Sequence, residues 1–392
     1  KLKDIMRILW RNNDMKVGII TWWRNNYGSI LQALALQQKL NQYNDLQYEI
    51  ICQFGKKSTS VDNVFDKIKS VGLAETCKRV FWKVAFKGLR LRNKKMQQFV
   101  DENLKVSNQQ YNEHDIADSN KYYDTYICGS DQIWNPDLVP TDSMYWLPFV
   151  EKGKNKIAYA PSFGASTVTE KQKEQIKANL STFKAVSCRE NSGARTINQI
   201  IGEKKCEAVL DPTMLIERDY WDTISEDKIY DEKYIFAYML RGTAAQRKYI
   251  EKIARERNLK IVSIPFLDYE KIDPYDLKFG DYKLWDANPA EFISAIRHAE
   301  YVFCDSFHCI VFSILYHRPF FVFPKVGADG KVKKSQISRM TDLLELAEIK
   351  NRILLDNEEA DLDAEIDWNN SDKRIQKARC DSERYLEQAL FM

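Results

Sequence analysis

The sequence predicts an α/β fold in which two mostly parallel sheets are covered by helices. Short apolar runs typical of buried strands alternate with helical patterns along most of the chain. The alternation occurs in two series, which are separated by an Asp-Pro-Thr turn at Asp211 and a charged stretch at 217–233. With 392 residues, 44% of them hydrophobic, the chain is long enough for two cores. We therefore expect two Rossmann-like halves that face a cleft.

The first series starts with a strand-like run at 16–21 and a helical pattern at 29–40. Further strands are expected at 124–128, 157–160, 185–188 and 208–210, and further helices at 170–183 and 191–201. We assign residues 15–215 to this N-terminal domain.

The second series predicts strands at 234–239, 260–264, 301–304 and 320–323, and helices at 243–257, 289–299 and 306–317. We assign it to a C-terminal domain at 216–350. Residues 351–392 form a helical extension, whose helix at 371–392 is expected to return to the first half. Ligands of such folds bind at the carboxyl ends of the strands, which points to the cleft between the halves.

Composition excludes several classes of protein. The net charge of +3 is too small to indicate a nucleic-acid partner. Eight cysteines without a CxxC pair indicate reduced thiols and a cytoplasmic location. No segment is apolar over the length of a membrane span. Residues 1–14 precede the first strand-like run at Met15, and the sequence does not tell whether they are native.

His308 is the most informative residue of the chain. The apolar strand at 301–304 is followed by Asp305 and Ser306, which read as a helix N-cap, so His308 is expected in the first helical turn. Exposed N–H groups and the helix dipole favour an anion there, beside a side chain that can transfer a proton. Alternatively, the histidine only caps its helix. A metal site with Cys304, Cys309 and His317 is not expected, because consecutive helical side chains diverge by about 100°.

Two loops of the first half are expected to face the cleft. In the loop at 21–29, Asn25, Asn26 and Gly28 tolerate the positive φ of a backbone-lined cradle, although no dinucleotide or ATP motif is present. The loop at 129–135 offers Asp131, Gln132, Trp134 and Asn135, which suit hydrogen bonding and stacking with a sugar. In both loops these residues are also common in purely structural turns.

Arg189 and Arg241 each follow a predicted strand, one in each half, so both can reach the cleft. A guanidinium suits a carboxylate or a phosphate, but most arginines form surface ion pairs instead. Residues 67–95 are rich in Lys and Arg with interleaved aromatic residues, which is typical of a helix that rests on an anionic membrane or of a solvated helix packed on the sheet.

Five motifs occur together in order: Asn26–Leu36, Gly129–Asn135, Ser187–Glu190, Leu210–Thr213 and Asp305–His308. Over about Met15 to Pro324 the chain resembles the polysaccharide pyruvyl transferase family. The resemblance implies a GT-B-like fold and transfer of the enolpyruvyl carbons of phosphoenolpyruvate to a sugar, with release of phosphate and closure of a cyclic ketal. It implies no metal and no cofactor besides phosphoenolpyruvate as co-substrate.

Carried onto this sequence, the resemblance makes His308 the catalytic acid, and we assign Asp131 to orienting or deprotonating the acceptor hydroxyl. We assign donor binding to Arg189, Arg241, Asp305, Ser306 and Gly28. We assign acceptor binding to Asn26, Gln132, Trp134 and Asn135.

The expected acceptor is a sugar of a lipid-linked surface polysaccharide precursor. The basic segment at 67–95 would then hold the protein at the inner face of the membrane, where such a precursor lies. Two alternatives stay open: a GT-B glycosyltransferase that uses a nucleotide sugar, and a carbohydrate-binding scaffold without catalysis.

Overall fold

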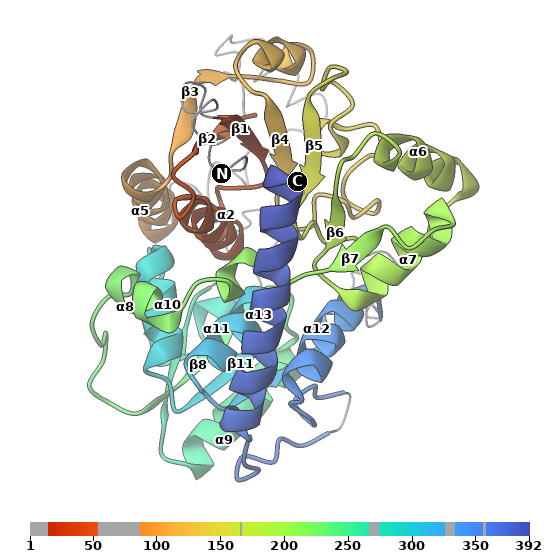
Figure 1. Cartoon of the computed structure of the whole chain (residues 1–392). Coiled ribbons are helices and arrows are strands. Elements are labelled where there is room, and N and C mark those ends of the chain that lie inside the picture. The colour runs from red at the N-terminus through yellow and green to blue at the C-terminus, as the bar shows by residue number, and fades with distance from the viewer. Residues whose placement is uncertain (1–14, 54–86, 165–166, 266–273, 326–333, 356–357) are drawn as a thin grey trace, which may run out of the picture.

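Two parallel five-stranded sheets, stacked end to end, form the framework of the protein (Figure 1). The computed structural model describes residues 15–53, 87–164, 167–265, 274–325, 334–355 and 358–392. Both sheets have the same strand order. The first strand of each half lies at the centre, the next two strands are added on one side of it, and the order then reverses, so that the last two strands are added on the other side. This reversal creates a topological switch point in each half, where ligands of open α/β sheets bind.

The first sheet has the order β3-β2-β1-β4-β5. Its strands are β1 (Met15–Ile20), β2 (Leu46–Cys52), β3 (Val106–Gln110), β4 (Thr125–Cys128) and β5 (Asn155–Ala158). A separate pair, β6 (Val186–Cys188) and β7 (Cys206–Ala208), continues from it through a single bridge between Ile157 and Ala185.

The second sheet has the order β10-β9-β8-β11-β12. Its strands are β8 (Tyr234–Tyr238), β9 (Lys260–Ser263), β10 (Tyr282–Lys283), β11 (Tyr301–Cys304) and β12 (Phe320–Val322). The central strands β8 and β11 are almost fully buried, as expected for strands that carry helices on both faces.

The described helices cover these sheets. They are α2 (Tyr27–Leu40), α5 (Lys87–Asn103), α6 (Glu170–Leu180), α7 (Asn191–Ile201), α8 (Arg218–Ile224), α9 (Ala244–Glu256), α10 (Pro289–Arg297), α11 (Phe307–Leu315), α12 (Lys334–Ala347) and α13 (Trp368–Phe391). Short 3-10 turns lie at Ile116–Lys121, Met144–Trp146, Pro212–Met214 and Pro274–Leu277.

The predicted elements are all present, with ends shifted by a few residues. The sequence analysis missed β2, β3, β10, α8 and α12, and of α5 it expected only the first part, as the end of a helix at 67–95. β3 is an edge strand with mostly exposed polar side chains, so it lacks the apolar signal of a buried strand. β10 spans two residues, which is too short for any periodicity.

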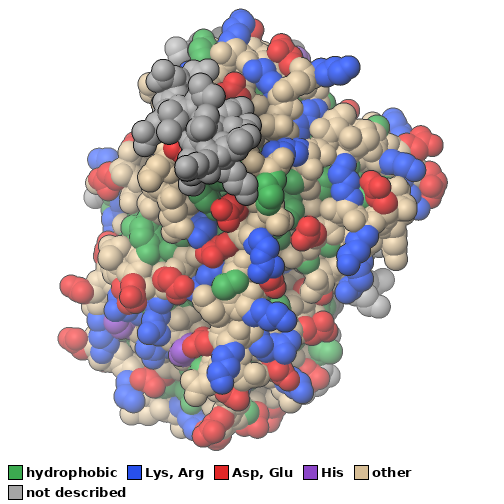
Figure 2. Space-filling model, in the orientation of Figure 1, with side chains coloured by type: hydrophobic (Ala, Val, Ile, Leu, Met, Phe, Trp, Pro, Cys, Tyr) green, Lys and Arg blue, Asp and Glu red, His purple; other side chains and the backbone are tan. Residues whose placement is uncertain are grey.

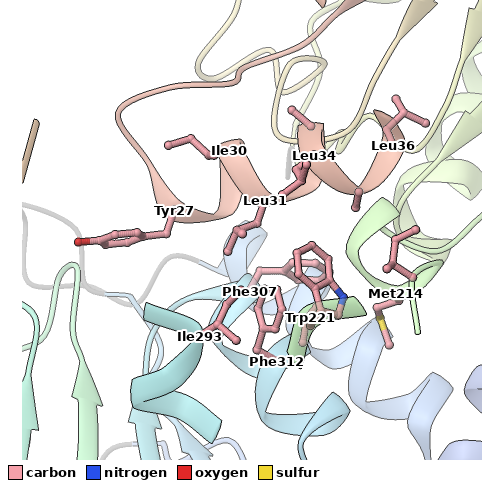
Figure 3. Close-up of a cluster of buried hydrophobic side chains, with 14 of the residues drawn as sticks. Tyr27, Ile30, Leu31, Leu34, Leu36, Met214, Trp221, Ile293, Phe307 and Phe312 are labelled. Carbon is pink, nitrogen blue, oxygen red and sulfur yellow. The ribbon is translucent and has the colours of Figure 1, made fainter. Parts of the chain in front are cut away.

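Helix α2 joins the two halves. It carries an almost continuous set of buried residues, because its outer face packs on helices of the second half (Figure 3). The Tyr27 ring stacks on Phe292 at 4.8 Å between centroids, and its hydroxyl donates to the carbonyl of Ala287. Figure 3 shows Leu31 and Leu34 of α2 above Phe307 and Phe312 of α11. One hydrophobic cluster therefore extends through both halves.

Helix α13 confirms the expected return of the chain. It starts beside the second half, where Trp368 stacks on His317, and runs upward along the molecule to the first half (Figure 1). There the Tyr385 hydroxyl donates to the carbonyl of Ala158 at 2.9 Å, and the Ser382 hydroxyl accepts from the backbone of Leu210. The helix thus bonds to both halves.

The exposed surface on this side mixes both signs of charge. Figure 2 shows Lys and Arg side chains interspersed with Asp and Glu over the face that carries α13, without an extended area of one sign. Such a surface gives no electrostatic reason to expect a polyanionic partner on this face.

The basic segment at 67–95 lies mostly outside the described residues, including its aromatic residues Phe81, Trp82 and Phe86. In its described part, Leu89 is fully buried, and the guanidinium of Arg92 donates to the carbonyls of Trp285, Pro265 and Leu284. For this described part, the interpretation as a helix packed on the protein fits, because Arg92 attaches α5 to the second half. Within the described residues, no helix combines the length and the apolar character of a bilayer span.

We predict that Tyr385→Phe lowers the free energy of unfolding by about 1 kcal/mol, because the carbonyl of Ala158 keeps the Ser187 hydroxyl but loses the second of its two buried donors. Chemical denaturation of both proteins measures the difference. Tyr122→Phe is the control, since Tyr122 is 51% exposed and should leave the stability unchanged. Equal stability of the Tyr385→Phe and wild-type proteins would contradict the role of α13 in the first half.

Candidate active site

The carboxylate of Asp211 lies at the centre of a buried polar cluster between the halves. Its Oδ2 accepts hydrogen bonds from Nη1 of Arg189 and from the Ser130 hydroxyl, both at 2.8 Å. Its Oδ1 accepts from the backbone N–H and the hydroxyl of Thr213. The side chain is fully buried, and a carboxylate is stable there only with such partners.

His308 approaches the same carboxylate from the second half. Its Nε2 lies 3.4 Å from Oδ2 of Asp211, which is longer than a good hydrogen bond. The residue is 7% exposed and lies, as predicted, in the first turn of α11. The imidazole is therefore held at the junction, with its Nε2 directed towards a negative charge.

Gly28 is necessary for this position of the imidazole. A Cβ at residue 28 would lie 2.0 Å from Nδ1 of His308, so only glycine lets the first turn of α2 touch the ring. The sequence analysis named Asn25, Asn26 and Gly28 as candidates for a positive φ, and this is confirmed for Asn25 but wrong for the other two. Asn26 is extended, Gly28 is helical, and the left-handed residue of the loop is Asn25, with φ of 63°.

The charges around Asp211 decide its protonation. Burial alone would raise the pKa of its carboxyl group, but His308 and Arg189, together with the Thr213 hydroxyl, hold the pKa well below its usual range. Asp211 is thus an anion at any physiological pH.

The N-terminus of α11 is open. Ser306 is the N-cap, with φ of −117° and ψ of 130°, but its side chain makes no capping hydrogen bond. The first turn of the helix contains no acidic residue. An anion can therefore approach the first N–H groups beside His308.

Asp305, which the sequence analysis assigned to donor binding, has both carboxylate oxygens occupied by backbone groups. It is 1% exposed, and its two oxygens accept from the backbone N–H groups of Leu240 and Arg241 at 2.8 and 2.6 Å. A buried carboxylate would also repel an anionic donor. Asp305 instead fixes the loop after β8 against the loop after β11, which are the two loops at the switch point of the second sheet.

The two predicted arginines differ in their surroundings. Arg189 is buried, pairs with Asp211 and lies over the Phe307 ring, 4.1 Å from its centroid. Its Nε is 4.0 Å from Oε2 of Glu190. Arg241 is exposed on the loop that Asp305 holds. Only Arg189 is in contact with the cluster around His308.

Asp131 lies at the switch point of the first sheet, in a left-handed conformation with φ of 73°. Its carboxylate accepts from the Ser29 hydroxyl at 2.5 Å and from the backbone of Gln132 at 2.8 Å. Non-glycine residues adopt such a φ at a cost, which is typical of functional loops. The charge of Asp131 acts on Arg189, so the residue borders the same cluster.

Two of the four predicted acceptor residues, Trp134 and Asn135, have structural roles. Trp134 is fully buried, stacks on Trp146 at 4.6 Å and donates to the carbonyl of Tyr145, so the prediction that it lines a sugar pocket is wrong. Asn135 is buried and closes its own turn through Gln132 and Asp137.

Asn26 and Gln132 are less restricted. Asn26 is exposed and caps α2 by accepting from the backbone of Ser29. Gln132 is half-buried, and its carbonyl oxygen accepts from Asn135. Both remain close to the loop ends, but neither is in contact with His308 in any described interaction.

Four buried polar atoms of this region have no hydrogen-bonding partner among the described residues: Arg189 Nε, Glu190 Oε2, His308 Nε2 and Arg339 Nε. Unpaired buried groups are rare in native proteins because each loses its hydration without compensation. Their concentration around one point indicates a site that a polar ligand completes.

Three of the residues in this cluster were not predicted. Asp211 and Glu190 lie in the quoted segments Leu210–Thr213 and Ser187–Glu190, so their positions after strands were a usable signal. Arg339 comes from α12 and carries no local signal.

A cavity of about 210 Å³ adjoins the cluster. Arg189, Asp211 and Phe307 line it, together with residues of α13 and of α12, among them Arg339. Among the described residues, no three His, Cys, Asp or Glu side chains are grouped as metal ligands would be.

Solved structures with a similar architecture include two UDP-N-acetylglucosamine 2-epimerases. The UDP-N-acetylglucosamine 2-epimerase of Rickettsia bellii overlaps with a TM-score of 0.50 at 9% identity, covering 97% of this chain and 100% of that one. The UDP-GlcNAc 2-epimerase of Neisseria meningitidis gives a TM-score of 0.48 at 9% identity and covers 96% of this chain and 95% of that one. At such identities the likeness shows the fold alone, which is GT-B-like.

A comparison with curated proteins finds no match to this sequence. The family model described as polysaccharide pyruvyl transferase matches residues 26–324. The matched range begins at the N-cap of α2, which touches His308, and ends beyond β12, so it contains Gly28, Asp131, Arg189, Asp211 and His308. The chain belongs to the polysaccharide pyruvyl transferase family.

Proposed function

We propose that the protein transfers the enolpyruvyl group of phosphoenolpyruvate to two hydroxyls of a sugar in a surface polysaccharide precursor, forming a cyclic ketal and releasing phosphate. The observation that carries the proposal is the position of His308. It lies at an open helix N-terminus, faces the buried carboxylate of Asp211 and is next to the Arg189 guanidinium. A proton donor is thereby combined with groups that attract an anion.

In the proposed reaction, protonated His308 transfers its proton to the methylene carbon of phosphoenolpyruvate, which becomes a methyl group. The adjacent carbon then carries oxocarbenium character and bonds to the first sugar hydroxyl, which loses its proton. The second hydroxyl displaces phosphate from the same carbon and closes the ring. Asp211 stabilises the imidazolium before the transfer and orients the ring, so it acts as a positioning residue.

The donor is anionic at both ends, and we assign its binding to Arg189, Arg241, Gly28 and the backbone N–H groups that follow Ser306. Asp305 supports Arg241 through the backbone rather than touching the donor. The second half is then the donor side and the first half the acceptor side. Asp131, at the first switch point, is the candidate that orients the acceptor hydroxyl.

A lipid-linked acceptor and a peripheral contact of residues 67–95 with the inner face of the membrane remain part of the proposal. Of that segment, Arg92 is turned inward and is not available for lipid. Co-sedimentation with anionic vesicles at low and high salt tests the contact.

We predict that His308→Ala lowers turnover by about a hundredfold or more, which is the usual contribution of general acid catalysis. Phosphate release from phosphoenolpyruvate is measured with a panel of aryl and lipid-linked sugars. His317→Ala is the matched control, since His317 contacts Asp372 and Trp368 outside the cluster and should retain activity. An active, folded His308→Ala protein would overturn the assignment, and stabilisation by nucleotide sugars alone would favour a glycosyltransferase.

Gly28→Ala should be as inactive as His308→Ala, because the added methyl group would occupy the space of the imidazole. The double variant provides the sharper measurement. If Gly28 acts only through His308, adding Gly28→Ala to His308→Ala removes no further activity, and the two effects are strongly non-additive. Additive losses would show that Gly28 has another role.

Asp211→Asn should destabilise the protein by about 3–5 kcal/mol at pH 7, because Arg189 loses its buried counter-charge. The folded-state pKa of Asp211 lies below its unfolded value of about 3.9, so its stabilisation is complete above about pH 5 and is lost as the pH falls towards the folded-state pKa. Urea denaturation at pH 7 and at acidic pH should therefore show a difference between the proteins that shrinks on acidification. A difference independent of pH would contradict the ionised state of Asp211.

A further inference from the structure

Arg339 is a buried arginine that lies outside the family match, which ends at residue 324. It is 3% exposed and lies on α12, in the second half. Its side chain extends to the first half, where its Cδ is 3.5 Å from the position of a Cβ at Gly164. It lines the same cavity as Arg189 and Asp211. Arg339 therefore brings a second guanidinium to the candidate site from the opposite half.

The guanidinium of Arg339 has no acceptor among the described residues, and its Nε is fully enclosed. Other buried arginines are used differently. Arg92 donates to three carbonyls, and Arg352, although its Nε and Nη1 are unpaired, donates through Nη2 to the carbonyl of Ala364 and lies over the Phe321 ring. Arg339 thus differs from these two arginines because it donates to no acceptor among the described residues.

The electrostatic surroundings agree with this distinction. Burial, and after it the nearby positive charge of Arg189, lower the pKa of Arg339 to about 10, although Glu190 and Asp131 act in the opposite direction. In the unliganded protein its charge is therefore a cost to stability. An anion in the cavity would remove this cost, and the neighbouring Nε of Arg189 is also without a partner.

We infer that Arg339 is a ligand-binding residue that, together with Arg189, holds an anionic group of the substrate, a phosphate or a carboxylate, in the cavity between the halves. The inference rests on the proposed function for the identity of the substrate as phosphoenolpyruvate. A planar guanidinium pairs with either group through two parallel hydrogen bonds. Because Arg339 and Arg189 come from different halves, the bound anion would connect the two.

The test compares wild type, Arg339→Gln and Arg352→Gln by thermal unfolding and by calorimetric titration. The probes are phosphoenolpyruvate, inorganic phosphate and pyruvate, each used separately. Without ligand, Arg339→Gln should melt at the wild-type temperature or above, because an uncompensated charge is removed. Its affinity for phosphoenolpyruvate should fall about tenfold to a hundredfold, the range expected for charge-assisted hydrogen bonds. Arg352→Gln should melt earlier but bind normally.

The separate probes identify the group that is bound. Loss of phosphate binding in Arg339→Gln assigns the phosphate, and loss of pyruvate binding assigns the carboxylate. If the wild type binds phosphate through Arg339 but neither binds nor turns over phosphoenolpyruvate, the anion site stands and the proposed function fails. A lower melting temperature of Arg339→Gln with unchanged binding of all three probes would overturn the inference.

Discussion

The buried charge of Asp211 is the constraint on which the rest of the site depends. A carboxylate without access to water requires positive and hydrogen-bonding partners, and here they come from both halves of the chain. Arg189 compensates the charge from the first half, and His308 faces it from the second. The position of His308, the close contact with α2 and the open end of α11 follow from that arrangement.

The polar cluster contains four buried atoms without a hydrogen-bonding partner among the described residues. The hydrophobic cluster beneath it extends through both halves and includes the rings of Tyr27, Phe292 and Phe312. The stability of this core permits unpaired groups above it, since a ligand site must keep some donors and acceptors free in the unliganded protein. Function and stability are thus divided between two adjacent layers of the same interface.

The sequence predicted what local patterns determine. The strand β11 and the start of α11 were correct because an apolar run and a cap residue are neighbours in the chain. Neighbouring residues do not determine the side to which a tryptophan points. Trp134 was therefore predicted to line a pocket, although it stacks on Trp146 in the core. Glycine is required at position 28 because of a contact with His308, a residue 280 positions away. Arg339 belongs to α12, a helix that was not predicted at all. Such pairings depend on how the two sheets are docked, which no short pattern specifies.

Helix α13 has a consequence for how the protein acquires its structure. The hydroxyls of Tyr385 and Ser382 complete the hydrogen bonds of Ala158 and Leu210, which belong to segments made much earlier in synthesis. During translation, the N–H of Leu210 has to wait for residues 368–391 to leave the ribosome, and the carbonyl of Ala158, which already accepts from Ser187, gains its second donor only then. The first half to be made is therefore the last to be finished, and until then its unprotected surface is a target for chaperones and proteases.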